Sequence, residues 1–536
     1  MLEDSKLSKS RADLSAESLV EPVYEKNVRK PSRSTSSHRP SPLAAELRRF
    51  SLDEEQCPYP TTVATFLSYF MLVLYGHVRD FLGKIFFPAA YKHLRVFNGY
   101  APLTGDFESL YTRRLYTRIR DCWHRTISGI PSRTLHLLER YSDDYNQTFT
   151  YTGRKKEMLN LSSYNYLGFA QGEGTCADSV VKVLKTHSVG IGSSRAEVGT
   201  LDIHLELEKL VARFVGKEEA MIFNMGFATN ALMISAFVGK GSLIISDELN
   251  HTSLVFGSRL SQATIQKFKH NDPDDLERVL RDAISQGQPR THRPWKKIIV
   301  IVEGLYSMEG SIVKLPEILA LKPKYKFYLF VDEAHSIGAL GPNGKGVCDF
   351  YGVSTSDVDM LMGTFTKSFG AAGGYIAGSS ELISHFRAEG FGHIYAEPMP
   401  PPVVEQVSMS MKIILGEDGT DEGKRRLKAI LDNSLYFMRE LRKMDFIIYG
   451  DEGSPIVPLL LFQPGKISHE ALARDMAVVV VGYPATPINS ARVRFCISAS
   501  HTQKDLDDAL KKVSEIGDVM QLKFKKKNWL SWTWVF

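Results

Sequence analysis

The sequence predicts an α/β fold: a large domain with a mostly parallel sheet and helices on both faces, followed by a smaller C-terminal α/β domain. Short apolar runs of strand type alternate with helical patterns through the middle of the chain, at 220–223, 243–246, 297–302 and 328–331. Continuous apolar runs are typical of parallel strands, which are covered on both faces. With 536 residues, 43% hydrophobic, the chain is long enough for a large core and accessory segments.

Residues 1–56 are rich in Ser, Arg, Lys, Glu and Pro, and we expect a disordered basic tail. Such a composition cannot bury enough apolar surface to order itself. The segment can bind anionic lipid or be phosphorylated, although a solvated tail is the simpler interpretation. The first apolar run comes too late for a signal peptide.

The segment 57–91 is predicted to be a hydrophobic, membrane-associated helix. Residues 61–78 contain no Asp, Glu, Lys or Arg and many large apolar side chains. This length is near the lower limit for a spanning helix. Basic residues flank the run on both sides, so the positive-inside rule gives no preference for crossing. A helix lying in the cytoplasmic leaflet therefore stays an alternative. A buried core helix is less favoured, because nothing precedes the run for it to pack against.

Three further segments complete the organisation. We expect a linker and N-terminal subdomain over 92–158, the large domain over 159–400, and the small C-terminal domain over 401–520. Within the large domain, Asp272 and Pro273 are typical of a helix start, as N-cap and first-turn residue of a helix over 274–285. The tail 521–536 is basic and then aromatic, which suits either a membrane interface or a partner subunit.

The most informative stretch is GTFTKSFGAAGG at 363–374, where Lys367 follows an apolar run among small and hydroxylic residues. Burial of an ammonium is costly, but desolvation lowers the lysine pKa, and the free amine can form a Schiff base with an aldehyde. Hydroxyls such as that of Thr364, with backbone N–H groups near Gly370, can hold a phosphate. Pyridoxal 5'-phosphate (PLP) needs this combination. Taken alone, a surface turn with a solvated lysine would be the better interpretation.

Asp332 and His335 strengthen the PLP interpretation. The apolar run 328–331 ends at Asp332, and a carboxylate at the carboxyl end of a buried strand points at the ligand crevice of an α/β sheet. There it can pair with the pyridinium N–H of PLP, while His335 can reach the phenolic oxygen. The sequence D-E-A-H is also found in helicases, but these need a G-x-x-x-x-G-K-[ST] loop, which this chain lacks.

Three more segments follow or form predicted strands. Gly226 lies between a strand and a helical pattern beginning at Leu232, where backbone N–H groups at a helix start favour an anion. His251 follows the run 243–246 and can stack on a cofactor ring, although a lone histidine there is more often structural. Arg494 lies inside an apolar strand, which is costly unless the guanidinium is paired. A substrate carboxylate and an internal salt bridge are equally good partners.

Bulk properties exclude some functions. A net charge of +5 is small for this length, and no basic stripe with interleaved aromatic residues is present, so no nucleic-acid partner is expected. The five cysteines are scattered, with no metal-type spacing. We therefore expect no metal site and a reducing compartment.

Taken together, residues 159–502 resemble the α-oxoamine synthase family of fold-type I PLP enzymes. The stretches that carry the resemblance are NLSSYNYLGFA (160–170), SSRAEVGTLDIHLELE (193–208), EGLYSMEGSIVKLPE (303–317), GTFTKSFGAAGGYIAG (363–378) and VVGYPATP (480–487). A further match lies upstream of this domain, at 79–103. Within the family, the resemblance is greatest to the catalytic chain that condenses L-serine with palmitoyl-CoA.

The resemblance implies a fold-type I PLP transferase whose large domain binds the cofactor. The implied reaction is the decarboxylating condensation of L-serine with palmitoyl-CoA to 3-ketodihydrosphingosine, the first step of sphingolipid synthesis. The implied catalytic residues are Lys367, Asp332 and His251. Further cofactor contacts are implied for His335, Gly226, Phe227, Ser307 and Thr364, and substrate contacts for Asn165 and Arg494.

Two alternatives stay open. A soluble member of the family would use glycine or alanine with another acyl-CoA, but the apolar run at 61–78 argues against this. A non-catalytic scaffold subunit would only complete the site of a partner, but such a chain need not retain Lys367.

The resemblance also implies partners and a location. We expect a heterodimer with a homologue that lacks the lysine, with room for small regulatory membrane subunits. The expected location is the endoplasmic reticulum membrane, with the catalytic domain in the cytosol. Relatives carry small hydroxylic residues after a tyrosine that reach the neighbouring subunit's phosphate. This chain departs from them with Glu397 and Pro398 after Tyr395, so no such contact is expected from it.

Overall fold

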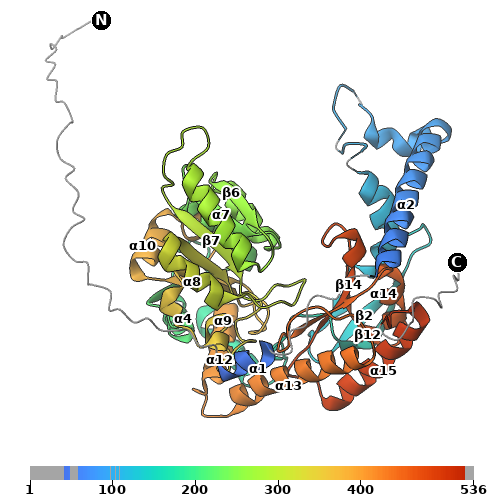
Figure 1. Cartoon of the computed structure of the whole chain (residues 1–536). Helices are drawn as coiled ribbons and strands as arrows, with labels where there is room; N and C mark the ends of the chain where they lie inside the picture. The colour runs from blue at the N-terminus through green and yellow to red at the C-terminus, as the bar shows by residue number, and fades with distance from the viewer. Residues whose placement is uncertain (1–40, 49–57, 97, 103, 108, 525–536) are drawn as a thin grey trace, which may run out of the picture. The chain divides into compact units, whose positions relative to one another are not determined.

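The computed structural model describes residues 41–48, 58–96, 98–102, 104–107 and 109–524 (Figure 1). Apart from 41–48, the expected N-terminal tail lies outside the described residues, as do residues 525–536 of the C-terminal tail. Residues 40–536 form one compact unit.

A seven-stranded sheet forms the centre of the large domain, in the order β4-β10-β9-β8-β7-β5-β6. β10 runs antiparallel to both of its neighbours, and the other adjacent pairs are parallel. The strands are β4 (Glu219–Phe223), β5 (Leu243–Asp247), β6 (Thr264–Phe268), β7 (Ile298–Glu303), β8 (Tyr328–Asp332), β9 (Met360–Thr364) and β10 (Gly374–Gly378). The predicted mostly parallel sheet is therefore confirmed, with one antiparallel strand inserted.

Both faces of this sheet are buried, because successive side chains of a strand point to opposite faces. Ile244 and Ile299 belong to a cluster with apolar residues of α5, α6 and α10. Their strand neighbours Ile245 and Val300 belong to a second cluster with residues of α4, α7 and α8. These helices are α4 (Asp202–Val215), α5 (Gly226–Phe237), α6 (Thr252–Leu260), α7 (Pro273–Gln286), α8 (Leu315–Tyr325) and α10 (Ser380–Glu389).

Two helix starts test the sequence patterns. The side chain of Asp272 accepts hydrogen bonds from the N–H groups of Asp274 and Asp275 at 3.1 and 3.0 Å, so the predicted start of α7 is confirmed. The predicted start near Leu232 is wrong, because α5 begins at Gly226. Its first turns bury polar residues, including Asn230, so they show no apolar periodicity.

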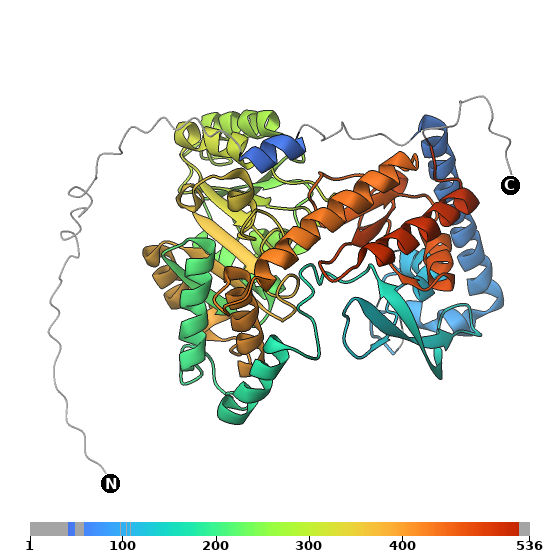
Figure 2. The same ribbon diagram turned by 90° about the horizontal axis from the view of Figure 1, so that it is seen from below.

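The remainder of the chain forms two smaller sheets with their own helices. One sheet is antiparallel, with β11 (Ile456–Leu460), β14 (Arg492–Cys496) and β13 (Val479–Val481). The other contains β1 (Ile127–Ser128), β2 (Thr134–Tyr141), β3 (Thr150–Asn160) and β12 (Met476–Ala477). The long helix α13, orange in Figure 2, runs from beside the central sheet toward these sheets. Helices α13 (Glu422–Lys443), α14 (Pro464–Ala473) and α15 (Gln503–Met520) pack in this part. Helices α3 (Thr175–His187) and α12 (Pro401–Leu415) pack on each other, and α12 also packs on α4 of the large domain.

Short elements connect these parts. They are α1 (Pro42–Arg48), α9 (Val347–Tyr351), α11 (Phe391–Ile394), η1 (Pro88–Leu94), η2 (Tyr111–Tyr116), η3 (Thr117–Cys122), η4 (Thr355–Asp357) and η5 (Ile488–Ser490).

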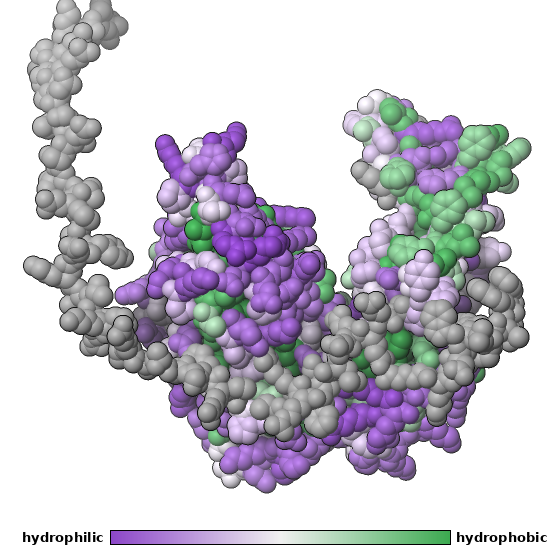
Figure 3. Space-filling view, in the orientation of Figure 1, coloured by the Kyte–Doolittle hydropathy of each residue, from purple (hydrophilic) through white to green (hydrophobic). Residues whose placement is uncertain are grey.

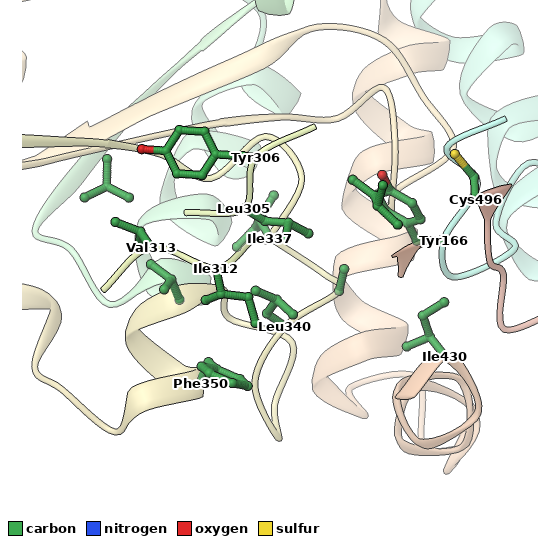
Figure 4. Close-up of a cluster of buried hydrophobic side chains, with 14 of the residues drawn as sticks. Tyr166, Leu305, Tyr306, Ile312, Val313, Ile337, Leu340, Phe350, Ile430 and Cys496 are labelled. Atoms are coloured by element: carbon green, nitrogen blue, oxygen red, sulfur yellow. The ribbon is translucent and has the colours of Figure 1, made fainter. Parts of the chain in front are cut away.

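One buried cluster connects the loops of the large domain to the small domain. Figure 4 shows Leu305 and Ile337, from the loops after β7 and β8, in the same core as Ile430 of α13 and Cys496 of β14. Tyr166 lies between them and is fully buried. The loops at the carboxyl edge of the sheet therefore rest on a packed base, which fixes where their side chains point.

A long apolar helix, α2 (Tyr59–Phe86, 28 residues), precedes these domains. Most of its large side chains are exposed, and they form the green surface at the upper right of Figure 3. Among the described residues it alone is long and apolar enough to cross a membrane, by length and composition only. Its buried Asp80 accepts a 2.8 Å bond from Arg113 and pairs with Arg114, which attaches the helix to η2.

Candidate active site

The candidate site lies at the carboxyl edge of the central sheet. β7 ends at Glu303, β8 at Asp332 and β9 at Thr364, and these three strands are neighbours. Because the carboxyl ends of parallel strands meet at one edge, these side chains gather around one crevice. Lys367 lies in the turn that follows β9.

Lys367 is the basic centre of this crevice. Burial lowers the pKa of its ammonium from 10.5 to about 8, although the carboxylates of Asp332 and Glu303 act in the opposite direction. Its Nζ lies 5.7 Å from the centre of the Tyr164 ring. A lysine in this state supplies a free amine at a far lower pH than a solvated lysine does.

Asp332 is buried and held in a fixed orientation. One carboxylate oxygen accepts a 2.7 Å bond from Asn230 Nδ2, and the other accepts a 2.8 Å bond from the N–H of Ala334. Asn230 also donates to the Ser253 hydroxyl at 3.0 Å, and its own Oδ1 is buried without a partner among the described residues. An amide on the first turns of α5 thus aims the Asp332 carboxylate.

Glu303 also belongs to the site, although the sequence patterns above did not lead to it. It pairs in register with Asp332 on the adjacent strand and is 4% exposed. Burial and the Asp332 charge raise its pKa well above the usual range for glutamate. Its Oε1 accepts a 2.5 Å bond from the N–H of His251. The rule that selected Asp332, a carboxylate at the end of a buried strand, would also have selected Glu303.

His251 is the N-cap of α6 and lies next to Phe227. Its Nδ1 accepts a 3.2 Å bond from the N–H of Ser253. The other ring nitrogen, Nε2, therefore points away from the start of α6. The Phe227 ring, 42% exposed, lies edge-on at 6.3 Å between ring centres. Desolvation lowers the pKa of His251. The charge of Asp332 raises this pKa, and the charge of Lys367 lowers it further.

The corner formed by Gly226 and Thr364 can hold a phosphate. A Cβ on Gly226 would lie 2.6 Å from Thr364 Oγ1, so the two backbones approach as only glycine permits. Thr364 Oγ1 donates to the carbonyl of Gly373 at 2.8 Å and lies 2.9 Å from the Thr366 hydroxyl. The first N–H groups of α5 have no side-chain cap and are free to bind an anion. This cradle fits the phosphate of PLP.

His335 is buried at the inner side of the crevice. Its Nδ1 lies 2.8 Å from the Tyr166 hydroxyl, and its ring meets Tyr164 edge-on at 5.2 Å. Burial, with the nearby charges of Lys367 and Arg494, lowers the pKa of His335 well below its usual range. The ring is therefore neutral and available as a hydrogen-bonding group.

Arg494 presents a buried guanidinium at the small-domain side. It bonds the Tyr164 hydroxyl, and its Nη1 donates to the carbonyl of Ser307 at 3.4 Å. Its Nε is buried without a partner, and no carboxylate of the described residues pairs with it. The neighbouring Arg492, in contrast, pairs with Glu309 at 3.5 Å. Of the two partners considered from sequence, the internal salt bridge is absent among the described residues.

The side chain of Asn165 bonds its own loop and the segment before β2. Its Oδ1 accepts a 3.1 Å bond from the N–H of Ala170, and its Nδ2 donates to the carbonyl of Pro131 at 3.3 Å. Asn165 thus shapes the loop that carries Tyr164 and Tyr166. These two tyrosines are site residues that lie within the motif NLSSYNYLGFA, but no pattern in the motif distinguishes them from its other members.

Comparisons with known proteins agree with this geometry. The family model for aminotransferase class I and II matches residues 156–513. Serine palmitoyltransferase 2 of Schizosaccharomyces pombe is 53% identical over 487 residues, covering 90% of this chain and 80% of that protein. Serine palmitoyltransferase 3 of Homo sapiens is 52% identical over 478 residues, covering 88% and 87%. This chain belongs to the serine palmitoyltransferase family.

A solved structure of this family, SPT with PLP, has a TM-score of 0.67 and 26% identity, and covers 78% of this chain and 98% of that one. The fold-type I architecture is therefore confirmed, as is the resemblance stated from the motifs. Membership of the serine palmitoyltransferase family makes this chain a PLP-dependent transferase.

Proposed function

We propose that this chain catalyses the decarboxylating condensation of L-serine with palmitoyl-CoA, using PLP held at Lys367, and so makes 3-ketodihydrosphingosine for sphingolipid synthesis. The observation that carries the proposal is the half-buried Lys367, whose pKa desolvation lowers to about 8, close to the charges of Asp332, Glu303 and Arg494. Membership of the family indicates the reaction, and these side chains are the groups that would bind the cofactor and the substrate for it.

The proposed place of the cofactor follows from the positions and charges of these side chains. The start of α5 at Gly226, with Thr364, would hold the phosphate. Asp332, aimed by Asn230, would pair with the ring nitrogen, and His335 would hydrogen-bond the phenolic oxygen. His251 and Phe227 would cover the ring on its open side. When bound, PLP supplies an electron sink for the carbanion formed at the serine Cα.

The side chains around the reacting centre have separate tasks. Arg494 would bind the serine carboxylate, because its Nε lacks a partner and a guanidinium fork matches a carboxylate. The backbone of Ser307 holds that guanidinium in position. Lys367 Nζ, once exchanged for the serine amine, would carry the proton from Cα, because a lysine with this pKa can both accept and donate near neutral pH.

The substrate role predicted for Asn165 is proposed in a modified form. Both ends of its amide bond the chain itself, so we assign it to positioning the Tyr164 and Tyr166 loop. Tyr164 would then lie beside the bound substrate, because its hydroxyl accepts a bond from Arg494 and its ring lies near Lys367 Nζ.

We further propose a heterodimer with a homologue of the same fold that lacks the lysine, and room for small regulatory membrane subunits. Support comes from Phe227 and Phe256, whose rings lie 6.1 Å apart beside His251 and which are 42% and 47% exposed. Adjacent exposed aromatic side chains of this kind suit a contact with a partner chain. Glu397, on the exposed segment after α11, is unsuited to reach a partner's phosphate because it would repel it.

The proposed location is the endoplasmic reticulum membrane, with the catalytic domain in the cytosol. α2 supports attachment, because it exposes Phe66, Phe70 and Phe81 to solvent at 50, 63 and 64%. The described cysteines are unpaired and buried, as expected of a reducing compartment. For the domains, we propose the same boundaries that the sequence predicts.

The experiment is to locate the cofactor and then test the substrates. Borohydride reduction of the PLP-loaded protein, followed by peptide mapping, should place the label on Lys367. Lys367→Ala should lose both the label and the product, whereas Lys217→Ala, a half-buried lysine elsewhere, should keep both. Label on another lysine would overturn the site. Activity with glycine or alanine in place of serine would instead point to another reaction of the α-oxoamine synthase type.

A further inference from the structure

Three side chains of metal-ligating type meet where η3 contacts α14, outside the active-site residues. Asp121 and Cys122 end η3, and His469 lies on α14. Their candidate ligand atoms all lie within 4.8 Å of one another. Cys122 Sγ lies 3.8 Å from His469 Nε2, and the Asp121 carboxylate forms an ion pair with the same nitrogen.

The sulfur of Cys122 faces several polar groups. Cys122 Sγ lies 3.9 Å from Asp121 Oδ1 and 3.7 Å from the carbonyl oxygen of Gly465, in addition to the imidazole. A thiol has a single hydrogen and donates to one of these groups at a time. As a thiolate, the sulfur would instead share a cation with the carboxylate and the imidazole.

The ligand set favours zinc. Carboxylate, thiolate and imidazole are the three kinds of side chain that bind Zn²⁺ in proteins, and a soft thiolate selects against Mg²⁺ and Ca²⁺. One carboxylate and one thiolate together neutralise a divalent cation. Arg125 Nε and Arg140 Nη2 donate to the backbone carbonyl of Asp121 at 3.1 and 3.4 Å, so positive charge also lies beside these two anions.

The distances need only one adjustment. Zinc bonds of about 2.0 Å to nitrogen and 2.3 Å to sulfur place tetrahedral N and S ligands about 3.5 Å apart, close to the 3.8 Å between Cys122 and His469. The Asp121 carboxylate and the His469 nitrogen must separate to make room for the ion. The His469 side chain is 53% exposed, so it has the freedom to move away from Asp121.

A fourth position is open beside the three ligands. Asp121 and His469 line a cavity of about 410 Å³ between η3, β2 and α14. A water molecule there can complete a tetrahedron, and Asn146 Nδ2 donates to Asp121 Oδ1 at 3.1 Å, which orients the carboxylate.

We propose that Asp121, Cys122 and His469 form a zinc site with a water in the fourth position. The ion joins the segment that follows α2 and η2 to the small domain. That junction already contains the bond from Trp123 Nε1 to the carbonyl of Val480, at 3.0 Å. Sequence spacing predicted no metal site, because Cys122 and Asp121 lie 347 and 348 residues before His469 in the chain.

The test uses the full-length, untagged protein in detergent, exposed to Zn²⁺ and then freed of loose metal by gel filtration. Elemental analysis should find stoichiometric zinc in the parent protein and a loss of most of it in Cys122→Ser and in His469→Gln. Cys176→Ser, which changes another buried cysteine on α3, should retain the metal. Replacement of Zn²⁺ by Co²⁺ should give a thiolate-to-cobalt charge-transfer absorption that Cys122→Ser and His469→Gln lose and that Cys176→Ser keeps.

Two results would overturn the site: parent protein with no more zinc than His469→Gln, or cobalt-loaded protein without the thiolate absorption. Because Cys122 is buried, its variant can fail to fold, but His469 is half exposed and its variant should fold. Zinc should raise the melting temperature of the parent and not that of His469→Gln, since only a native-state ligand stabilises. Equal shifts in both proteins would contradict the proposal. The outcome is independent of PLP binding at Lys367.

Discussion

At the scale of single residues, two neighbouring carboxyl groups of the crevice have opposite characters. Asp332 accepts two N–H bonds from Asn230 and Ala334, whereas Glu303 accepts one and has its pKa raised by burial and by the Asp332 charge. Two adjacent groups whose environments differ in this way can serve as a fixed charge and a neutral acid. We assign the role of ring-nitrogen partner to Asp332, because its two hydrogen bonds hold the carboxyl group in one orientation.

The role of Asp332 gives the first prediction. Asp332→Asn replaces the charge with a neutral amide of the same size, so the cofactor ring nitrogen would lose its anionic partner. We expect product formation to fall by about 10³-fold or more, because positioning alone cannot replace an electron sink. Asp359→Asn is the matched control: this carboxylate accepts the N–H of Leu329 at 2.7 Å, at the other end of the same strands. Near-normal turnover by Asp332→Asn would contradict the assigned role.

The pKa of Lys367 gives the second prediction. Burial lowers it to about 8, so the reactive amine forms as the pH rises through about 8 rather than through 10.5. The rate at which PLP joins the cofactor-free protein should therefore increase with pH and level off above about 8. Absorbance of the bound cofactor measures this rate. A midpoint near that of a solvated lysine would show that Lys367 is not buried in solution. His251, whose pKa is lowered from 6.5, titrates outside this window.

At the scale of elements, the start of α5 decides whether an anion can enter. Gly226 is the first helical residue, and any side chain there meets Thr364. The strand before it and the helix after it hold their positions through the two clusters that cover the sheet. The cradle is therefore a property of how β4, β9 and α5 pack, and no single side chain creates it.

The third prediction tests this packing. In Gly226→Ala the new Cβ would lie 2.6 Å from Thr364 Oγ1, so either the helix start or the threonine must shift. We expect PLP to dissociate about tenfold faster or more, while the fold persists. Gly239→Ala is the control, because its nearest neighbour lies at 3.8 Å and its backbone is not left-handed. Retention of PLP in dialysis equal to that of the parent would exclude Gly226 from the phosphate site.

Elements also show what the sequence could predict. Runs that are buried on both faces are continuous in sequence, so the strands and the residues at their ends, such as Asp332 and Thr364, were predictable. The role of Asn230 was not predictable. Its side chain bonds Asp332, which lies 102 positions away, and such a contact leaves no local signal in the sequence. The roles of Tyr164 and Arg494 depend on a small-domain strand meeting a loop 330 residues earlier. The proximity of Asp121, Cys122 and His469 has no local signal in the sequence for the same reason.

At the scale of the whole molecule, α2 is fixed to the enzyme on one side and exposed on the other. Asp80, Thr65 and Gly76 are its buried residues, and they lie on one face. The Asp80 pairs with Arg113 and Arg114 are 5, 16 and 17% exposed, so they are shielded from solvent ions and resist salt. This arrangement favours a helix that rests in the membrane surface while its charged side holds the subdomain, although the helix is also long enough to span.

The last prediction separates the exposed face of α2 from its docking face. Changing Phe66, Phe70 and Phe81 together to Ser removes apolar side chains that are at least half exposed and contact no core. Burial of a phenylalanine contributes roughly 1.5–3 kcal/mol, so loss of three should weaken membrane binding by several orders of magnitude. Flotation with vesicles of neutral and anionic lipid, using the chain expressed without partners, measures this binding. PLP absorbance should be unchanged, because the fold of the large domain does not depend on these residues. A control triple change of Val181, Val198 and Leu205 to Ser, exposed on the large domain, should leave flotation as in the parent. If the α2 variant floats equally well, the attachment of this chain to membranes lies elsewhere.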